Sequence, residues 1–501
     1  MERSSCSDLD HELGNDLKII INDSVFNVAK TDLVKNCDFF RALFQSGMRE
    51  CRQQAITLQS VGAPGFLVLL QVLHCERPML SIDQITEAIQ CTAFLQAPAL
   101  TKHLISIINS ENCLLMYDTS ATYGVWELFH QSALFIRDMH ADLKEDLLTL
   151  PRELVEYVES LLPSSYVAVC SHSPINQSSE LLRNTQRNVF HLDEEEGEWK
   201  VLTHLPASTS TTMAGMAVLN NKLYIIGGVH DVSKRVLELG YCYNPATNIW
   251  STIHGPQQLR YNLTLIGHEG CLYAVGGEYN KTLLSSVERF RECEGGWSFA
   301  SPLDCPAAAV PSAVTMARIF ICLWRGKGTT DLLEYLPEDN QWLLLTTLTH
   351  QSSYALHMVA HRDNLFVMRN GPCGDFLLCM MDCYNLSSGQ WTSLSSQYNS
   401  LFTAVIKGDS AFTLSRHATT EYAVDGCRWR QKRTMKCFGR IGSIYTFQLR
   451  LPKTSVSNME KSLDLTKRQI PSPEASSKDV QVSLREQILK VFLLGLSECK
   501  M

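Results

Sequence analysis

Two histidines four positions apart, His357 and His361, have the spacing that most resembles a metal-binding motif. On a helix this spacing places both imidazoles on one face, as it does in zinc-dependent proteases. The residues between them include Met-Val-Ala, and the segment has the alternating pattern of a strand, in which ligands four apart do not converge. We therefore expect a strand here and no metal site.

Two other segments could do chemistry. Residues 326–330, Gly-Lys-Gly-Thr-Thr, resemble part of a phosphate-binding loop but lack its earlier glycine and its following helix, so we expect a hairpin turn. The acidic run 193–196 could bind a cation or a basic partner, but such runs are usually solvated loops, and we expect one here. No Gly-x-Ser-x-Gly elbow occurs, and no nucleophile with an ordering base can be chosen. The sequence therefore indicates a protein that is not an enzyme and uses no cofactor.

The cysteines do not form a zinc-binding pattern. There are 18 of them, no two form a Cys-x-x-Cys pair, and the cluster of Cys373, Cys379 and Cys383 lacks the short paired spacing that zinc requires. The first 18 residues contain acids and no apolar segment typical of a secretory signal. We therefore expect reduced, mostly buried thiols in an intracellular, cytoplasmic protein.

Length and charge narrow the class further. The 501 residues exceed the roughly 250–300 at which a single core stops growing, so at least two domains are expected. With 44 Lys and Arg against 52 Asp and Glu, the net charge of -8 gives no broad basic surface for nucleic acid. The longest uncharged run, residues 53–75, contains several Gln, a Pro and a Gly, so we expect a strand and a core helix and no membrane contact.

The second half of the chain contains a repeat marked by tryptophan. Six tryptophans follow one another at intervals of 51, 47, 45, 49 and 38 residues: Trp199, Trp250, Trp297, Trp342, Trp391 and Trp429. An aromatic residue stands seven positions before each of the last five: Tyr243, Phe290, Tyr335, Tyr384 and Tyr422. A period of this length is typical of the blades of a β-propeller.

Each repeat also contains short alternating apolar runs. Examples are LYIIGG at 223–228 and LYAVGG at 272–277, each preceded by a partner run and a polar turn. Alternation of this kind predicts half-buried strands. Each repeat is then a small antiparallel sheet that buries its apolar faces only against neighbouring copies.

The glycine pairs Gly227-Gly228 and Gly276-Gly277, with the aromatic residues that follow them, resemble kelch motifs. Later repeats lose the glycines, with Leu323-Trp324 and Arg369-Asn370 in their places, but keep the period. Residues 189–199 resemble the outer part of a repeat and residues 442–451 its beginning, so together they would complete a sixth blade. The resemblance therefore implies an all-β, six-bladed kelch propeller over residues 186–451, closed by its N-terminal strand.

The N-terminal third has a different pattern. From residue 16 the sequence predicts a strand, a turn at Asn22-Asp23, a second strand and a helix with Phe39, Phe40 and Phe44 on one face. A further strand near Ile56 and helices over 66–73 and 85–100 follow in order. This order resembles the α/β BTB (POZ) fold over residues 15–117.

Three further segments complete the multidomain organisation. Residues 118–163 look helical and resemble a shortened BACK-like linker, and residues 164–185 are polar, so we expect a flexible link. Residues 452–501 lack strand periodicity and are expected to be mostly disordered, with 482–496 able to form an amphipathic helix.

Together these resemblances identify the chain as similar to BTB-kelch proteins. That resemblance implies a homodimer through the BTB domain, bound to Cullin-3 through Phe44, Met48 and Glu50, with a protein substrate held by propeller loops for ubiquitination. Taken by itself, Met48-Arg49-Glu50 is also compatible with a helix end and a solvated charge. The substrate contacts that we predict are Arg260 and Tyr261, just ahead of a repeat's first strand.

Two alternatives remain open. Several kelch proteins bind actin filaments, so the chain could instead be a bivalent scaffold, and a propeller enzyme is a more distant third reading. The stretches FFRALFQSGMREC and SSYVAVCSHSP resemble a muscle-associated member of the family, which implies a sarcomeric setting.

Overall fold

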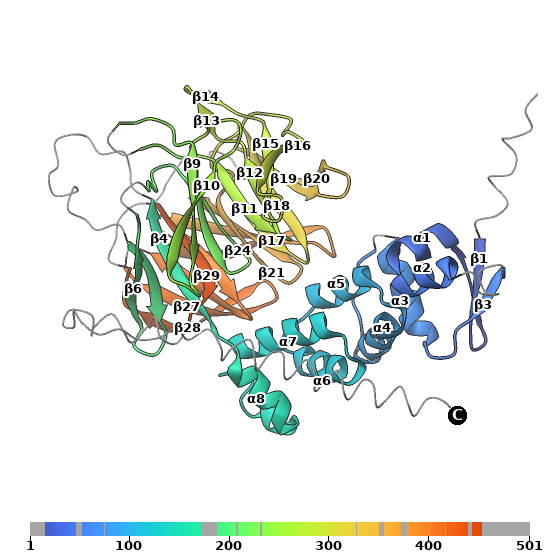
Figure 1. Ribbon diagram of the computed structural model, residues 1–501. Coiled ribbons are helices and arrows are strands. Elements are labelled where there is room, and N and C mark those ends of the chain that lie inside the picture. The colour runs from blue at the N-terminus through green and yellow to red at the C-terminus, as the bar shows by residue number, and fades with distance from the viewer. Residues whose placement is uncertain are drawn as a thin grey trace, which may run out of the picture. The chain divides into compact units, whose positions relative to one another are not determined.

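In the computed structural model of the chain the described residues are 16–46, 53–74, 76–171, 188–206, 209–230, 233–326, 328–349, 355–371, 378–399, 401–415, 417–438 and 443–452 (Figure 1). The chain divides into two compact units, an N-terminal α/β unit and a C-terminal all-β unit.

A three-stranded sheet begins the N-terminal unit. Strands β1 (Asp16–Ile21) and β2 (Ser24–Ala29) form an antiparallel hairpin, in which Asn22 takes a left-handed conformation with φ of 51°. Strand β3 (Ala55–Thr57) pairs with β1 in parallel. The predicted strand–turn–strand order is therefore confirmed.

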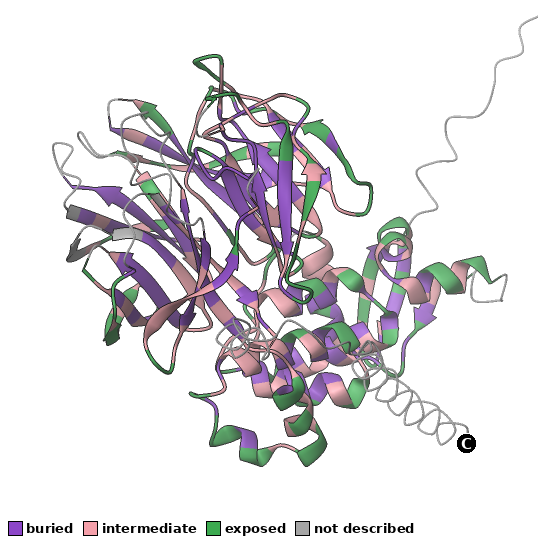
Figure 2. Ribbon diagram, turned by 60° about the vertical axis from the view of Figure 1, so that its left-hand side comes forward, coloured by how far each residue is buried: buried purple, intermediate pink, exposed green. Residues whose placement is uncertain are grey.

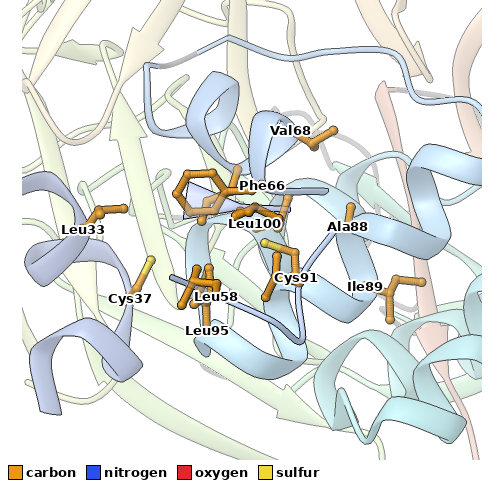
Figure 3. Close-up of a cluster of buried hydrophobic side chains, with 14 of the residues drawn as sticks. Leu33, Cys37, Leu58, Phe66, Val68, Ala88, Ile89, Cys91, Leu95 and Leu100 are labelled. Carbon is orange, nitrogen blue, oxygen red and sulfur yellow. The ribbon is translucent and has the colours of Figure 1, made fainter. Parts of the chain in front are cut away.

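Helices pack on this sheet around one core (Figure 3). They are α1 (Lys30–Asn36), α2 (Asp38–Gln45), α3 (Ala63–Leu73), α4 (Ile82–Leu95) and α5 (Pro98–Ser106). Helix α4 starts with a capping box in which the Ser81 hydroxyl accepts from the Gln84 amide N–H. In Figure 3 Phe66, Leu95 and Leu100 come together from α3, α4 and α5, and all three are fully buried. The uncharged run 53–75 thus forms a strand and a core helix, and no helix in the described ranges is long and apolar enough to cross a membrane.

A short helical segment follows the core. It contains α6 (Cys113–Tyr123), α7 (Trp126–Asp138), the 3-10 turn η2 (Asp146–Thr149) and α8 (Arg152–Ser160). Aromatic rings join these helices: Phe129 stacks on Tyr117 at 4.7 Å and contacts Tyr157 at 5.0 Å. The Tyr117 hydroxyl donates to the Leu154 carbonyl at 2.9 Å, which fixes α8 against α6. The predicted helical character of 118–163 is confirmed.

The C-terminal unit contains six four-stranded antiparallel sheets in its described part. The first strands are β7 (Gly215–Leu219), β11 (Thr264–His268), β17 (Ser312–Thr315), β21 (Ala355–His361), β25 (Leu401–Lys407) and β29 (Ser443–Arg450). The second strands are β8 (Lys222–Ile226), β12 (Cys271–Val275), β18 (Arg318–Gly326), β22 (Asn364–Asn370), β26 (Ser410–Ser415) and β4 (Ser164–Ser171).

The third strands are β9 (Leu239–Asn244), β15 (Val287–Arg291), β19 (Thr329–Leu336), β23 (Leu378–Asn385), β27 (Thr419–Asp425) and β5 (Asn188–Asp193). The outer strands are β10 (Ile249–His254), β16 (Gly296–Ala300), β20 (Gln341–Thr349), β24 (Gln390–Asn399), β28 (Arg428–Met435) and β6 (Glu198–His204). A short hairpin, β13 (Glu278–Tyr279) and β14 (Thr282–Leu283), extends the second sheet's loop.

These sheets form a closed ring of six blades, numbered 1 to 6 by their first strands β7, β11, β17, β21, β25 and β29. Each first strand contacts the first strand of the next sheet, in the order β7, β11, β17, β21, β25 and β29, and β29 contacts β7 again. Apolar side chains fill the junctions between blades, and Figure 2 shows long buried stretches along the propeller strands. The predicted six-bladed propeller is confirmed.

The spacing of the aromatic residues has a geometric cause. In blades 1 to 4 the aromatic residue and the tryptophan seven positions later face each other across the hairpin of the third and fourth strands, as Tyr243 and Trp250 do. Their rings lie 5.1 Å apart in blade 1 and 5.3 Å apart in blade 2. The indole N–H then reaches the blade before it, because Trp297 donates to the His254 carbonyl at 2.8 Å. The repeat therefore encodes both a hairpin and a contact between blades.

The sixth blade corrects one prediction. Residues 164–171, expected to belong to a flexible link, form β4, which pairs with β29 from Ser164↔Arg450 to Ser171↔Ser443. The blade is thus closed by three N-terminal strands and one C-terminal strand, with β29 innermost. The run from Tyr166 to Cys170 is fully buried, whereas the polar residues that suggested a link come after it. The rest of the predicted link, residues 172–185, and the predicted tail beyond residue 452 lie outside the described residues.

Candidate protein-interaction sites

The predicted cullin contact begins at the end of helix α2. Phe44 is half-buried there, its ring stacks on Phe40 at 6.4 Å, and the Lys30 ammonium lies 3.9 Å from its centroid. The adjacent Phe39 contacts Phe94 of α4 at 5.0 Å, which ties this helix to the core. A partly exposed aromatic ring with a cation over its face offers an apolar contact and a positive edge. Met48 and Glu50 lie outside the described residues, so their role stays a prediction.

The structure overturns the prediction for Arg260. Its side chain is 0% exposed and forms an ion pair at 2.5 Å with Glu288, which is also 0% exposed. The same guanidinium donates to the carbonyls of Gly276 at 2.9 Å and Ser286 at 3.0 Å. Burial lowers the pKa of Arg260 from its ordinary value, and Glu288 opposes that shift. Arg260 therefore holds blade 2 together from inside and cannot touch a substrate in this conformation.

The buried ion pair also positions a connecting segment, through hydrogen bonds to Glu288. Its carboxylate accepts from the backbone N–H groups of Gln257 at 2.6 Å and Gln258 at 3.0 Å. These residues belong to the segment that joins β10 of blade 1 to β11 of blade 2. The ion pair therefore fixes the course of that connection, which includes Tyr261.

Tyr261 is half-buried, and its backbone forms a two-way hydrogen-bonded bridge with Glu278 at 3.0 and 2.7 Å. The neighbouring Asn262 donates from its side-chain amide to the Glu278 carboxylate at 2.9 Å. This places Tyr261 beside the short β13–β14 hairpin, which starts at Glu278. Its contact with a substrate stays a prediction.

A chain of hydrogen bonds links the connections that precede three successive first strands. The Asn262 N–H donates to the Met213 carbonyl at 2.6 Å, and the Ala309 N–H donates to the Asn262 carbonyl at 2.8 Å. All three residues take left-handed conformations, with φ of 54°, 54° and 48°. Such conformations cost about 1–3 kcal/mol each for non-glycine residues and gather at functional sites. Met213 and Ala309 are exposed, so this end of blades 1 to 3 offers an ordered surface.

Trp324 was missed as a surface residue by the sequence analysis. It is 56% exposed, and Leu356 in the next blade is 44% exposed. The Cys322 thiol of β18 lies 3.7 Å from the Met358 sulfur of β21, where the two blades meet. Trp324 and Leu356 are each two positions along these strands toward the loops, so they lie at the same end of this junction. The signal was present in the sequence, because Trp324 stands where earlier repeats have a glycine.

The two histidines with metal-like spacing have structural contacts. His357 lies on β21, as expected, with Nε2 2.9 Å from the Ala404 carbonyl, and burial lowers its pKa. His361 Nε2 instead lies 2.8 Å from an Asp409 carboxylate oxygen. Within the described ranges, no group of three or more His, Cys, Asp or Glu side chains could hold a metal ion. Gly326 and Thr329 face each other at the end of the β18–β19 hairpin, as predicted.

The acidic run 193–196 forms the turn between β5 and β6, as expected, but its carboxylates are not simply solvated. Glu194 pairs with Lys407 of blade 5 at 2.7 Å, and Asp193 pairs with Lys200 at 2.8 Å. Most of the described cysteines are buried, as predicted: eight of the 13, all of which have free thiols.

Comparison with known proteins agrees with both units. A BTB/POZ domain model matches residues 9–112, and a kelch motif model matches residues 210–253 and 259–303. Human kelch repeat and BTB domain-containing protein 13 is 45% identical over 441 residues, which cover 87% of this chain and 95% of that protein. The mouse protein of the same name has the same identity and coverage.

The chain belongs to the BTB-kelch family. A more distant relative, mouse kelch-like protein 42, is 26% identical over 298 residues, 52% of this chain and 59% of that protein.

The kelch matches cover only the two blades that keep the glycine pair, 210–253 with β7–β10 and 259–303 with β11–β16. The later blades of this BTB-kelch protein form the same four-stranded sheets without those glycines. The kelch motif model therefore matches fewer blades than the structure contains.

Proposed function

We propose that this BTB-kelch protein is a substrate adaptor of a Cullin-3 RING ubiquitin ligase. The observation that carries the proposal is the presence of a BTB fold and a six-bladed propeller in one chain; a relative with 45% identity is likewise named for kelch repeats and a BTB domain. The BTB domain would dimerise and hold the cullin, and the propeller loops would hold the protein to be ubiquitinated.

Three residues would form the cullin contact. Phe44 supplies a half-buried ring at the end of α2, and Met48 and Glu50 follow it closely in sequence. A methionine adapts its shape to an apolar groove, and a carboxylate accepts charge-assisted hydrogen bonds from a partner's donors. We propose the same surface for every copy of the homodimer, which makes the adaptor bivalent.

No chemistry by this chain is needed for such a role. Holding a substrate near a ubiquitin carrier raises the local concentration of its lysines, and effective concentrations in the millimolar range follow from short tethers. An ordered loop surface, such as the hydrogen-bonded series Met213–Asn262–Ala309, supports binding with little entropy loss. We propose a cytoplasmic location and, from the stretches that resemble a muscle-associated member of the family, the contractile apparatus of muscle as the setting.

The test is a pull-down of Cullin-3 by the full-length chain and by the double variant Met48→Asp, Glu50→Ala. The matched control is Glu76→Ala, Met79→Asp, which changes the same residue types at exposed positions of the same unit. Dimer size and thermal unfolding check that each variant is folded.

Binding by wild type and control, with loss in the Met48/Glu50 variant, is the expected result. Failure of the wild type to bind Cullin-3 would overturn the adaptor role. Co-sedimentation with actin filaments, unchanged by Glu50→Ala, would then support the scaffold alternative.

A further inference from the structure

The outer strand of blade 5, β28, differs in charge from the other outer strands. It has the sequence RWRQKRTM and contains four cations in eight residues: Arg428, Arg430, Lys432 and Arg433. The outer strands of the other five blades, β6, β10, β16, β20 and β24, contain a single Lys or Arg between them, Lys200. In a chain with a net charge of -8, this concentration of positive charge is local to one edge.

Two of the cations are already used within the propeller. Arg433 pairs with Glu421 at 2.5 Å and Lys432 pairs with the same carboxylate at 3.2 Å. These two pairs hold the pKa of Glu421 below its ordinary value against the opposing effect of its burial. The basic end of β28 near Arg433 is therefore structural.

Arg428 and Arg430 have no such use. Both are exposed, and neither makes an ion pair with any residue in the described ranges. Side chains alternate along a strand, so these two lie on one face while Trp429, between them, packs into the junction with blade 4. Residues two apart on a strand are separated by about 6.6 Å, so the two guanidinium groups form a short regular row.

Protection against aggregation is a common reason for charge on an edge strand. That reason would apply equally to β20, an outer strand of nine residues without any charge, which exposes Leu343 and Leu344 by 49% and 53%. The chain does not protect that more apolar edge with cations. The charge on β28 therefore indicates recognition of an anionic partner.

We propose that β28 is a docking edge for an extended acidic segment of a partner protein, added as a further strand to blade 5. Among the described strands β28 is the last of its sheet, so its outer edge supplies backbone donors and acceptors, as edge strands do in strand-addition complexes. Acidic side chains at every second position of the added strand would face Arg428 and Arg430 at the same spacing. This surface is separate from the propeller loops, and the proposal does not rest on the ligase role.

The experiment uses the full-length chain and two fluorescein-labelled peptides about ten residues long, one alternating Glu with Thr and one alternating Glu with Pro. Both carry the same charge, but proline lacks the N–H and cannot form a paired strand. Fluorescence anisotropy gives the affinity of each peptide at low salt and at about 0.3 M salt. The variant is Arg428→Glu, Arg430→Glu, with the milder Arg428→Gln, Arg430→Gln beside it.

The matched control is Arg235→Glu, Lys281→Glu, which makes the same charge change at exposed cations in blades 1 and 2. We expect the Glu-Thr peptide to bind the wild type and the control equally. We expect its affinity to fall by about tenfold or more in both β28 variants, to fall with salt, and to exceed that of the Glu-Pro peptide.

Three outcomes would overturn the proposal. Equal binding of the two peptides would show that no strand is added, and unchanged binding to the β28 variants would place the site elsewhere. Binding of phosphatidylserine vesicles that depends on Arg428 and Arg430, without binding of the Glu-Thr peptide, would assign the edge to a lipid surface.

Discussion

Blades 2 and 3 of the propeller reach the same four-stranded sheet by different means. In blade 2 the second strand, β12, ends at Val275, and the glycine pair that follows it takes left-handed conformations with φ of 57° and 103°. In blade 3 Leu323 and Trp324 replace the glycines, and β18 continues as a strand to Gly326. Strand pairing therefore maintains the period of the repeat. The glycine pair determines where the second strand ends, and its replacement in blade 3 lets the strand continue and expose Trp324.

The two blades also differ in how they hold their charges. The Arg260–Glu288 pair of blade 2 is completely buried, whereas Arg318 and Glu334 of blade 3 keep 16% and 4% of their side chains exposed. Blade 2 replaces water with hydrogen bonds to backbone carbonyls and amides. The Arg318 side chain of blade 3 stays partly exposed to solvent, so the two blades should respond differently to the loss of an arginine.

The largest effect is expected from Arg260→Met. Removing the guanidinium leaves the carboxylate of Glu288 buried without its cation, which costs about 3–5 kcal/mol. The midpoint of propeller unfolding, followed by tryptophan fluorescence in denaturant, measures the loss. Arg318→Met is the matched variant and should lose less, because water reaches its site. An equal loss in both variants would contradict the difference between the blades.

A second, smaller effect is expected from Gly227→Ala in blade 1, which has the same glycine pair as blade 2. Gly227 has φ of 66°, and an added Cβ would lie 2.5 Å from the Arg260 carbonyl oxygen. A left-handed conformation costs a non-glycine residue about 1–2 kcal/mol, and the steric overlap adds to that cost. We expect a total loss of about 3 kcal/mol in the same unfolding measurement.

Gly326→Ala in blade 3 separates the two contributions to that loss. Gly326 has φ of 87°, but no atom lies within 4 Å of its added Cβ, so only the conformational cost remains. We expect about 1–2 kcal/mol for this variant. If Gly326→Ala lost as much unfolding free energy as Gly227→Ala, the close approach of blades at the kelch glycines would contribute nothing to stability.

The same contrast explains what the sequence could and could not predict. The tryptophan period and the seven-residue aromatic spacing are local properties of a hairpin, so they predicted six blades although the later ones lack the glycine pair. Strand β4 was missed because its polar neighbours in sequence outweighed its run of five buried residues, Tyr166 to Cys170, and its partner β29 lies about 280 positions away.

Arg260 was assigned to the substrate face because it stands just ahead of a repeat's first strand, in a connecting segment where an arginine is usually exposed. Its burial depends on Glu288, 28 positions later, and on carbonyls of two other segments. No local pattern contains that information. Phe44 was placed correctly on a helix next to the core, because the helix period fixes one apolar face.

The smallest effect on stability is expected from Trp324→Ser in blade 3. The side chain is 56% exposed and stands where blade 2 has a glycine, so the fold of the blade does not depend on it. We expect the free energy of propeller unfolding to change by no more than about 0.5 kcal/mol. Trp342→Ser in the same blade is the matched control, since its indole donates to the Ser301 carbonyl at 2.9 Å and packs on Tyr335 at 4.8 Å. That variant should be destabilised by about 3 kcal/mol or more. A large loss in Trp324→Ser would mean that the exposed indole had taken over the structural role of the missing glycine, and the two blades would then differ less than their backbones indicate.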